Sequence, residues 1–253
     1  MTALLEATDI TKHFSGITAL DHVSIEVSHG EMVGLIGPNG AGKTTLFNCL
    51  AGVIDADRGR VLLDGHDLAH FPPNRRSRLG IARTFQRIEL FAGLTVREHL
   101  LVAERAQHRR GGLWRDLIGR SKPTETERSH ADEVLELVGL TAEADVPAQA
   151  LPLGRGRLVE LARALVCDPR LLFLDEPSSG LDGHETSEMA AVLEQVHRDR
   201  ELAILLCEHD VPFVERLAAR TYVLDCGQLI ASGATDEVLS DPAVRAAYLG
   251  TEA

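Results

Sequence analysis

Short apolar runs alternate along much of this chain with longer amphipathic segments. The runs span residues 31–37, 170–175, 202–207 and 221–226, and turns or charged residues bound each of them. Runs of this length are typical of buried strands, and most of the segments between them have the length and rhythm of helices. Buried strands that alternate with helices predict a largely parallel sheet that is covered on both faces.

Three other parts of the chain have different patterns. Residues 19–30 and 59–68 alternate apolar and polar positions and contain turn signals, which predicts antiparallel strands. From about residue 87 to 166 the pattern is helical, with a capping-box spacing at Thr95 and Glu98. Within it, residues 108–126 are polar, glycine-rich and basic, so we expect an exposed excursion there.

Composition narrows the class of protein. The chain has 253 residues, of which 44% are apolar, so it can bury a large core. With 26 Lys and Arg against 38 Asp and Glu, the net charge is −12. This charge argues against nucleic-acid binding, which needs a broad basic surface. No apolar run approaches the roughly 20 residues of a membrane span, and the first residues lack a basic flank and an apolar leader segment. We therefore expect a cytosolic chain.

The cysteines do not suggest a metal or disulfide framework. Cys49, Cys167, Cys207 and Cys226 include no CxxC pair. We interpret them as reduced thiols in the core.

The strongest chemical signal is GPNGAGKTT, between an apolar run and a helix-like segment. Its residues are Gly37, Pro38, Asn39, Gly40, Ala41, Gly42, Lys43, Thr44 and Thr45. The spacing is that of a phosphate loop, in which glycines let the backbone turn so that N–H groups face phosphate oxygens. Lys43 would neutralise the β- and γ-phosphates, and the Thr44 hydroxyl would ligate Mg²⁺. A plain glycine turn is the alternative.

Polar residues follow three of the other predicted strands. Asp175 and Glu176 end the run LLFLDE, where Asp175 fits a second Mg²⁺ contact and Glu176 fits the base that polarises an attacking water. His209 follows residues 202–207 and would reach a γ-phosphate; the alternative is a capping or surface histidine. Gln86, after another short strand, is a candidate contact to Mg²⁺ or the water. Without the phosphate loop, a solvated acidic loop would be the better interpretation of 175–176.

A glycine also lies at the start of a predicted helix in LPLGRGR, residues 151–157. A turn before an ordinary amphipathic helix explains Gly154 equally well on these residues alone.

Taken in order, the motifs resemble a known family. GPNGAGKTT, TFQ, LPLGRGR, LLFLDEP, SSGLD and CEHD follow one another as in the ATP-binding subunit of an ABC transporter, over nearly the whole chain. TFQRIELFAGLTVREHLLVA and the terminal AAYLG are similar to the nucleotide-binding subunits of bacterial branched-chain amino-acid importers. The resemblance implies an α/β fold in one nucleotide-binding domain, residues 1–253. A P-loop core with an antiparallel β subdomain would span 1–86 and 161–253, and a helical subdomain 87–160.

The resemblance also implies roles for three further residues. Gly154 would present its N–H to the γ-phosphate bound by a second ATP-binding subunit, Phe14 would stack on adenine, and Asp182 would link the two sites across the dimer. A core phenylalanine at a strand end is the alternative for Phe14. The glycine segment departs from the family pattern LSGGQ, with Pro152 for the serine, Leu153 for the first glycine and Arg155, expected to be solvated, for the glutamine.

The function that the resemblance implies is MgATP hydrolysis in the energy-coupling subunit of a membrane ABC importer for branched-chain or related amino acids. It would lie on the inner face of the cell membrane, bound to permease subunits and, through them, indirectly to a solute-binding protein. The altered signature favours a heterodimer over a homodimer. One alternative is a soluble ABC ATPase acting on nucleic acid or ribosomes, but its tandem cassettes, long insertion or basic face are not visible. The other is a non-hydrolysing switch, which predicts loss of Glu176 or His209; both are present.

Overall fold

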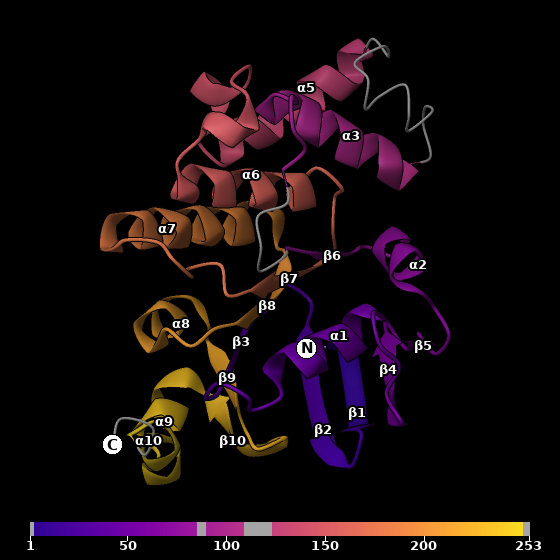
Figure 1. Cartoon of the computed structure of the whole chain (residues 1–253), viewed down its shortest axis with the longest axis vertical. Helices are drawn as coiled ribbons and strands as arrows, with labels where there is room; N and C mark the ends of the chain where they lie inside the picture. The colour runs from indigo at the N-terminus through magenta and orange to yellow at the C-terminus, as the bar shows by residue number, and fades with distance from the viewer. Residues whose placement is uncertain (1–2, 85–89, 109–122, 250–253) are drawn as a thin grey trace.

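The described residues form two β-sheets, and helices pack on both faces of the larger one. The structure, a computed structural model, describes residues 3–84, 90–108 and 123–249. Helices α3 (Val96–His108), α5 (Glu125–Leu137) and α6 (Leu153–Leu165) gather at one end of the molecule, opposite α10 (Pro242–Leu249) (Figure 1). Among the described residues, we find no helix with the length and apolar character to cross a membrane.

The larger sheet has six strands in the order β10-β9-β3-β8-β7-β6. Its strands are β3 (Met32–Ile36), β6 (Ile81–Arg83), β7 (Leu171–Asp175), β8 (Ala203–Cys207), β9 (Arg220–Asp225) and β10 (Gln228–Ala234). All neighbouring pairs are parallel except β9 and β10. Every residue of β3, β7 and β8 is buried, which explains their uninterrupted apolar sequences. The four predicted buried strands are confirmed, and their carboxyl ends meet at one edge, where open α/β sheets bind ligands.

The smaller sheet is antiparallel, in the order β2-β1-β4-β5. Its strands are β1 (Ala3–Phe14), β2 (Ile17–Ser28), β4 (Arg58–Leu63) and β5 (His66–Asp67). The antiparallel strands predicted at 19–30 and 59–68 are confirmed. The pattern did not reveal β1, because its pairing with β2 shifts register between Ala7 and Ile10, and Asp9 there has a φ of 54°. Such a bulge breaks the two-residue alternation that marks a strand.

Side-chain caps mark the starts of several helices, among them α5 (Glu125–Leu137). The helices not yet given are α1 (Lys43–Ala51), α2 (Pro73–Arg78), α7 (Gly183–Arg200), α8 (Val211–Leu217) and α9 (Thr235–Ser240), with 3-10 turns η1 (Thr141–Glu143) and η2 (Ala148–Ala150). The predicted capping box forms, since the Thr95 N–H donates to the Glu98 carboxylate at 2.8 Å and the Glu98 N–H donates to Thr95 Oγ1 at 3.3 Å. Thr124 caps α5 in the same way, so the excursion predicted over 108–126 ends earlier than expected. Residues 109–122 of that excursion lie outside the described part.

Two hydrophobic cores cover the two faces of the larger sheet. One lies between the sheets and contains Leu46, Phe47 and Leu50 of α1, all fully buried. The other packs helices α3, α5, α6 and α7 against β7 and β8. Full burial of a Leu or Phe side chain contributes about 1.5–3 kcal/mol, so α1 is firmly held and fixes the position of the loop that precedes it.

The cysteine prediction is partly wrong. All four thiols are free, and Cys49 and Cys207 are buried as expected. Cys167 is only half-buried, and Cys226 is exposed because it occupies the turn between β9 and β10 with a φ of 45°. Burial raises the pKa of Cys49 and Cys167 to about 11, so both are unreactive thiols near neutral pH.

Candidate functional site: a phosphate-binding cavity

The phosphate loop connects β3 to α1, and two of its glycines are required by the backbone. A Cβ at Gly37 would lie 2.0 Å from the carbonyl oxygen of Leu224, so no side chain fits there. Gly42 has a φ of 105°, a conformation that favours glycine, and is the N-cap of α1. The loop therefore leads directly into a helix N-terminus, where backbone N–H groups are available to anions.

Lys43 lies inside this loop. Its side chain is buried, and its Nζ donates to the carbonyl oxygens of Gly37 at 2.6 Å and Pro38 at 3.1 Å. A positive charge held by neutral carbonyls is available to phosphate oxygens that enter the loop. Lys43 thus lies within the loop, and its contact with the β- and γ-phosphates stays a prediction.

A cavity of about 530 Å³ opens over the loop. It is lined by Ile17, Thr18, Ala19, Asn39, Gly40, Ala41, Gly42, Lys43, Thr44, Thr45, Glu176, Cys226 and Gly227. This volume is typical of a small-molecule site. The structure therefore brings Glu176 to the same cavity as most of the predicted loop, while Gly37 and Pro38 lie behind it and accept from Lys43.

The acidic pair ends β7, as predicted. Asp175 is buried, and its Oδ2 accepts from the Arg83 guanidinium at 2.7 Å. Glu176 has a φ of 49°, unusual for a residue with a side chain, and its N–H donates to the Cys207 carbonyl oxygen at 2.9 Å. This backbone turn separates the two carboxylates, because Asp175 stays in the core and Glu176 lines the cavity. Such left-handed residues are concentrated at functional sites.

His209 follows β8 and lies between two carboxylates. Its Nδ1 is 4.0 Å from Glu176 Oε1 and 3.7 Å from Glu208 Oε2. The Glu208 side chain is fully buried and accepts the N–H groups of Ser178 at 2.9 Å and His209 at 3.1 Å. Burial raises the pKa of the Glu208 carboxyl above its ordinary value. Glu208 thus connects the segment after β7 to the segment that carries His209.

The residues present fit a magnesium ion that is shared with a nucleotide. Mg²⁺ prefers oxygen ligands, and Thr44 and Asp175 supply a hydroxyl and a carboxylate. In the described ranges, no group of three or more His, Cys, Asp or Glu residues is placed to hold a metal. Mg²⁺ usually keeps several waters and binds through one or two protein ligands and the phosphates of a substrate. The Asp175 carboxylate already pairs with the Arg83 guanidinium at 2.7 Å, so a magnesium ion there would compete with this cation.

Phe14 is placed at the rim of the antiparallel sheet. Its side chain is 45% exposed, so the alternative of a core phenylalanine is wrong. It pairs in register with Ile17, which lines the cavity, and Lys12 Nζ lies 5.4 Å from the centre of its ring. Its adenine-stacking role stays a prediction.

Gly154 and Asp182, at the N-terminal ends of α6 and α7, share one partner, the Glu185 carboxylate. Asp182 is the N-cap of α7, where its side chain accepts the Glu185 N–H at 2.8 Å. The Glu185 carboxylate in turn accepts the N–H groups of Gly154 and Asp182, each at 3.2 Å. A Cβ at Gly154 would lie 2.7 Å from Glu185 Oε1, so glycine is what permits this contact. The predicted roles of Gly154 and Asp182 toward a second subunit stay predictions.

The expectation of a solvated Arg155 is wrong. Its guanidinium donates to Glu143 Oε1 at 2.7 Å, to Glu188 Oε1 at 2.9 Å and to the Gly139 carbonyl oxygen at 2.6 Å. Arg155 therefore connects α6 to η1 and α7. All three partners belong to the same chain, so the Arg155 guanidinium is hydrogen-bonded within its own subunit.

Gln86 lies outside the described residues, so its predicted contact with Mg²⁺ or water stays a prediction. The described part of this segment ends at Thr84, whose N–H donates to the Phe173 carbonyl oxygen at 3.0 Å. The chain at Thr84 is therefore still aligned beside β7.

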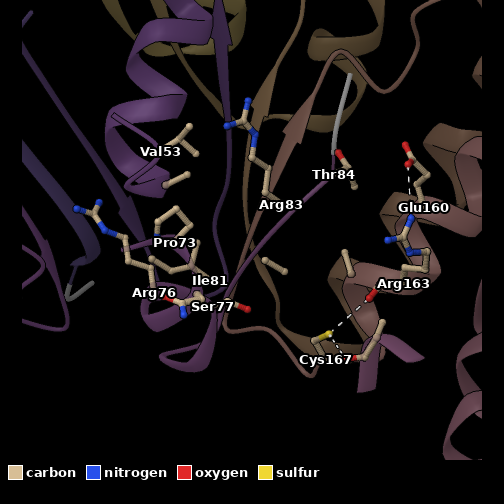
Figure 2. Close-up of a pocket in the computed structure, with 15 residues that line it drawn as sticks. Val53, Pro73, Arg76, Ser77, Ile81, Arg83, Thr84, Glu160, Arg163 and Cys167 are labelled. Atoms are coloured by element: carbon tan, nitrogen blue, oxygen red, sulfur yellow. Dashed lines mark hydrogen bonds and ion pairs between the residues drawn. The ribbon is translucent and has the colours of Figure 1, made fainter. Parts of the chain in front are cut away.

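A second cavity, which we call the groove, has a volume of about 380 Å³. One wall is formed by α2, β6 and the end of α1, and the other by α6 with Glu160, Arg163 and Cys167 (Figure 2). Val53, on the first wall, is 54% exposed. The groove lies between the sheet and the group of helices that the sequence assigns to a helical subdomain.

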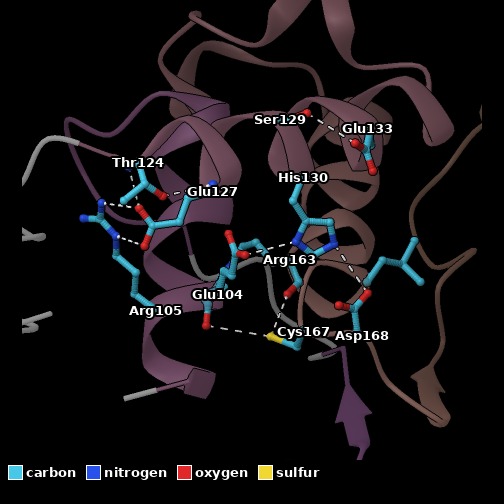
Figure 3. Close-up of polar contacts among 12 residues, drawn as sticks. Glu104, Arg105, Thr124, Glu127, Ser129, His130, Glu133, Arg163, Cys167 and Asp168 are labelled. Carbon is cyan, nitrogen blue, oxygen red and sulfur yellow. Dashed lines mark hydrogen bonds and ion pairs between the residues drawn. The ribbon is translucent and has the colours of Figure 1, made fainter. Parts of the chain in front are cut away.

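A bidentate ion pair joins α3 to α5 within this group of helices. Arg105 donates to the Glu127 carboxylate through Nε at 3.1 Å and NH2 at 2.8 Å, and the Thr124 N–H donates to the same carboxylate at 2.8 Å (Figure 3). Fixed fork geometry makes such Arg–carboxylate pairs strong.

The residue boundaries of a separate helical subdomain stay a prediction, since α6 belongs to a core that also includes β7 and β8.

Sequence reasoning missed three residues of the site. Arg83 and Asn48 contact each other and connect β6 to α1, and Glu208 holds the segment before His209. The sequence offered one signal, because Glu208 directly precedes His209 after a buried strand, and a buried strand end is a costly place for a carboxylate. Arg83 and Asn48 had no such signal, since neither lies in a recognisable motif.

The fold and the site together define a P-loop ATP-binding protein. Residues 20–179 match the ABC transporter family model, and residues 228–253 match that of the branched-chain amino acid ATP-binding cassette transporter. The chain therefore belongs to the ABC transporter family, as an ATPase subunit of the branched-chain amino-acid type. This confirms the predicted family and the predicted fold, a P-loop core with an antiparallel sheet and helices.

Individual relatives are similar in sequence to this chain over nearly their whole lengths. The high-affinity branched-chain amino acid transport ATP-binding protein LivG of Salmonella typhimurium is 38% identical, with 98% of both chains covered. BraF of Pseudomonas aeruginosa, which carries the same description, is 36% identical with the same coverage. The crystal structure of the ADP conformation of MJ1267, an ATP-binding cassette of an ABC transporter, superposes with a TM-score of 0.86. That structure is 32% identical, and the match covers 99% of this chain and 100% of that one.

Proposed function

We propose that the chain hydrolyses MgATP to drive a membrane importer of branched-chain or related amino acids. The observation that carries the proposal is a cavity shared by the phosphate loop and Glu176, in a chain similar along its full length to transport ATP-binding proteins. It would work on the cytoplasmic side, peripherally bound to permease subunits in the cell membrane. A solute-binding protein would act with the permease and not touch this chain.

The proposed chemistry assigns one role to each cavity residue. Lys43 and the N-terminus of α1 would hold the β- and γ-phosphates. Glu176 would accept a proton from a water whose oxygen bonds to the γ-phosphorus, while the bond to the bridging oxygen breaks and releases ADP and phosphate. Mg²⁺, held by Thr44 and Asp175 with Gln86 as a further candidate ligand, supplies positive charge to the phosphate oxygens when it is bound. His209, beside Glu176, would contact the γ-phosphate.

A second ATP-binding subunit would complete each site. Gly154 at the start of α6 would face the γ-phosphate on the partner, with Asp182 beside it. Pro152 is the N-cap of α6 and makes no side-chain cap bond, so this chain offers no hydroxyl there. We therefore favour a heterodimer in which the partner supplies an intact signature to the site built on Lys43 and Glu176.

The groove is the proposed docking place for a cytoplasmic helix of a permease subunit. It lies between two parts of the fold, it exposes Val53, and it is continuous with Thr84, which precedes the segment that contains Gln86. Arg83 and Arg163 on facing walls would donate hydrogen bonds to carboxylates or carbonyl oxygens of such a helix (Figure 2). A permease helix in the groove would be coupled to the nucleotide site through β6 and β7, which carry Arg83 and Asp175.

The test is ATP-driven uptake of labelled leucine into vesicles that contain the chain, its permease and its solute-binding protein. Glu176→Gln keeps the shape of the side chain and removes its basicity, so ATP turnover should fall about 10²- to 10⁴-fold. MgATP binding should persist, and closed dimers should accumulate. Glu215→Gln, the same charge change at an exposed position of α8, is the control and should transport normally. Hydrolysis at the wild-type rate by Glu176→Gln would contradict the assignment.

A further inference from the structure

Arg83 connects two elements of the nucleotide site. It ends β6, in register with Phe173 of β7, and its guanidinium donates to Asp175 Oδ2 at 2.7 Å and to Asn48 Oδ1 at 2.6 Å. Asn48 belongs to α1, the helix that follows the phosphate loop. One arginine therefore joins the phosphate-loop helix to the carboxylate proposed to bind Mg²⁺.

The contact places a cation on a carboxylate that Mg²⁺ also needs. The Asp175 side chain is 3% exposed and the Arg83 side chain 14%, so water screens the pair poorly. Charge-assisted hydrogen bonds of this kind are among the strong ones in proteins. The carboxylate can neutralise only part of each positive charge, and the guanidinium and Mg²⁺ therefore oppose each other at Asp175.

The same arginine also lines the groove. Arg83 and Thr84 lie on the wall that faces Arg163 and Glu160 of α6 (Figure 2). On the core side, the guanidinium carbon is 5.9 Å from the ring centre of Phe47, which is fully buried. Arg83 therefore lies between the buried Phe47 ring and the groove. Its Nε is buried and has no acceptor among residues 3–84, 90–108 and 123–249, so Asp175 and Asn48 do not satisfy every donor of the guanidinium.

We propose that Arg83 is a positioning residue that couples occupancy of the groove to the Mg²⁺ carboxylate. With the groove open, the guanidinium neutralises Asp175. An oxygen acceptor of a permease helix in the groove draws Arg83 away, and Asp175 then binds Mg²⁺ with its full charge. This inference rests on the proposed function, because it takes the permease helix as the occupant of the groove.

The first experiment uses the isolated full chain and measures binding, not turnover. Calorimetry gives two quantities. The first is the Mg²⁺ midpoint, which is the Mg²⁺ concentration at which ATP binding is half complete, and the second is the affinity for ATP in EDTA. Arg83→Gln should lower the Mg²⁺ midpoint about tenfold, the lower end of what a hydrogen bond to a charged group contributes. ATP binding in EDTA should weaken several-fold, because Asp175 then repels the phosphates unopposed. A wild-type midpoint in a folded Arg83→Gln chain would overturn the proposal.

Two further variants complete the experiment. Arg198→Gln removes the same charge at an exposed position of α7, outside the groove, and should leave the midpoint within about twofold of wild type. Should Arg83→Gln fail to fold, Arg83→Lys keeps the charge, but an ammonium cannot bridge Asn48 and Asp175 as a planar fork does. It should lower the midpoint about threefold, and an unchanged midpoint would again overturn the proposal. Thermal unfolding shows which variants are folded.

The second experiment adds the permease in detergent or vesicles. Assembly should lower the Mg²⁺ midpoint of the wild type several-fold and leave that of Arg83→Gln unchanged. Equal shifts in both would overturn the coupling through Arg83. A wild-type chain that binds no MgATP, or no permease, would instead refute the proposed function, so the two failures are distinguishable.

Discussion

The ion pair between Arg105 and Glu127 is expected to carry a measurable share of the stability of the protein. We choose Glu127→Gln as the perturbation, because a glutamine can still serve in the capping box at Thr124 while the charge opposite Arg105 is lost. The variant therefore isolates the charged part of the contact between α3 and α5. It should lower the free energy of unfolding at neutral pH.

The magnitude follows from the pKa of Glu127. Hydrogen bonds from the Arg105 side chain lower this pKa from 4.5 to about 2, against desolvation and with help from the Thr124 N–H. At about 1.4 kcal/mol per pH unit, the difference corresponds to an upper limit of about 3.4 kcal/mol. The Glu127 side chain is 10% exposed, so solvent screens the pair to some extent. We expect a loss of about 1.5–3 kcal/mol at pH 7.

The pH dependence has a defined sign. A carboxylate whose pKa is lower in the folded state stabilises the fold above its unfolded pKa, and this contribution disappears as pH falls through the folded pKa. The difference between wild type and Glu127→Gln should be constant above about pH 5, retain about three quarters of its value at pH 4, and fall below half at pH 3. Urea unfolding at these pH values measures it.

The control for this prediction is Glu125→Gln. Glu125 is exposed in the first turn of the same helix and carries the same charge near the same helix terminus. Its replacement should cost no more than about 0.3–1 kcal/mol, the range of a helix-terminus interaction. Equal losses in the two variants, or a Glu127→Gln loss that grows as the pH falls, would refute the reasoning.

Three other predictions concern the site and its partners. Lys43→Ala should weaken ATP binding in calorimetry more than AMP binding, since its ammonium lies in the phosphate loop; an unchanged ATP dissociation constant would count against this. Pro152→Ser with Leu153→Gly should raise turnover at the partner's site more than at this chain's own, because a hydrogen bond to a charged group contributes about 1.5–3 kcal/mol, or about 10- to 150-fold. A native homodimer, or equal turnover at both sites, would exclude the asymmetry. A cysteine at Val53 should crosslink to the permease helix in a nucleotide-dependent way, and one at Glu215 should not; the reverse pattern would place the permease elsewhere.

The strands of the larger sheet could be predicted because full burial requires a continuous run of apolar residues. Strands such as β3 and β7 are covered on both faces, and each therefore reads as a short apolar run between turns. β1 left no such trace, since the bulge at Asp9 interrupts its alternation. The exposed position of Cys226 was equally hidden, because a cysteine in a turn has no signal that separates it from a cysteine in a strand.

The site could be predicted where backbone geometry demands particular residues. Gly37 and Gly42 are fixed by a carbonyl contact and by a left-handed φ, so the loop has a recognisable spacing. The partners of side chains were not predictable, because they depend on which strands lie together. Arg83 meets Asp175 only because β6 pairs with β7, elements that are far apart along the chain. Arg155 is held by contacts from η1 and α7 for the same reason.

The bond between Gly154 and Glu185 bears on how two such chains would open and close. The amide proposed to face the partner's nucleotide is already donated to a carboxylate of its own chain. A phosphate from the partner would therefore replace the Glu185 carboxylate at this amide, and the strength of closure would be a difference between two anion affinities. A terminal phosphate carries more charge and more acceptor oxygens than a carboxylate, which favours the exchange. If Gly154 has this role, Glu185 would regain the amide once hydrolysis has removed that phosphate, and the contact that restrains closure would also reset the pair for the next turnover.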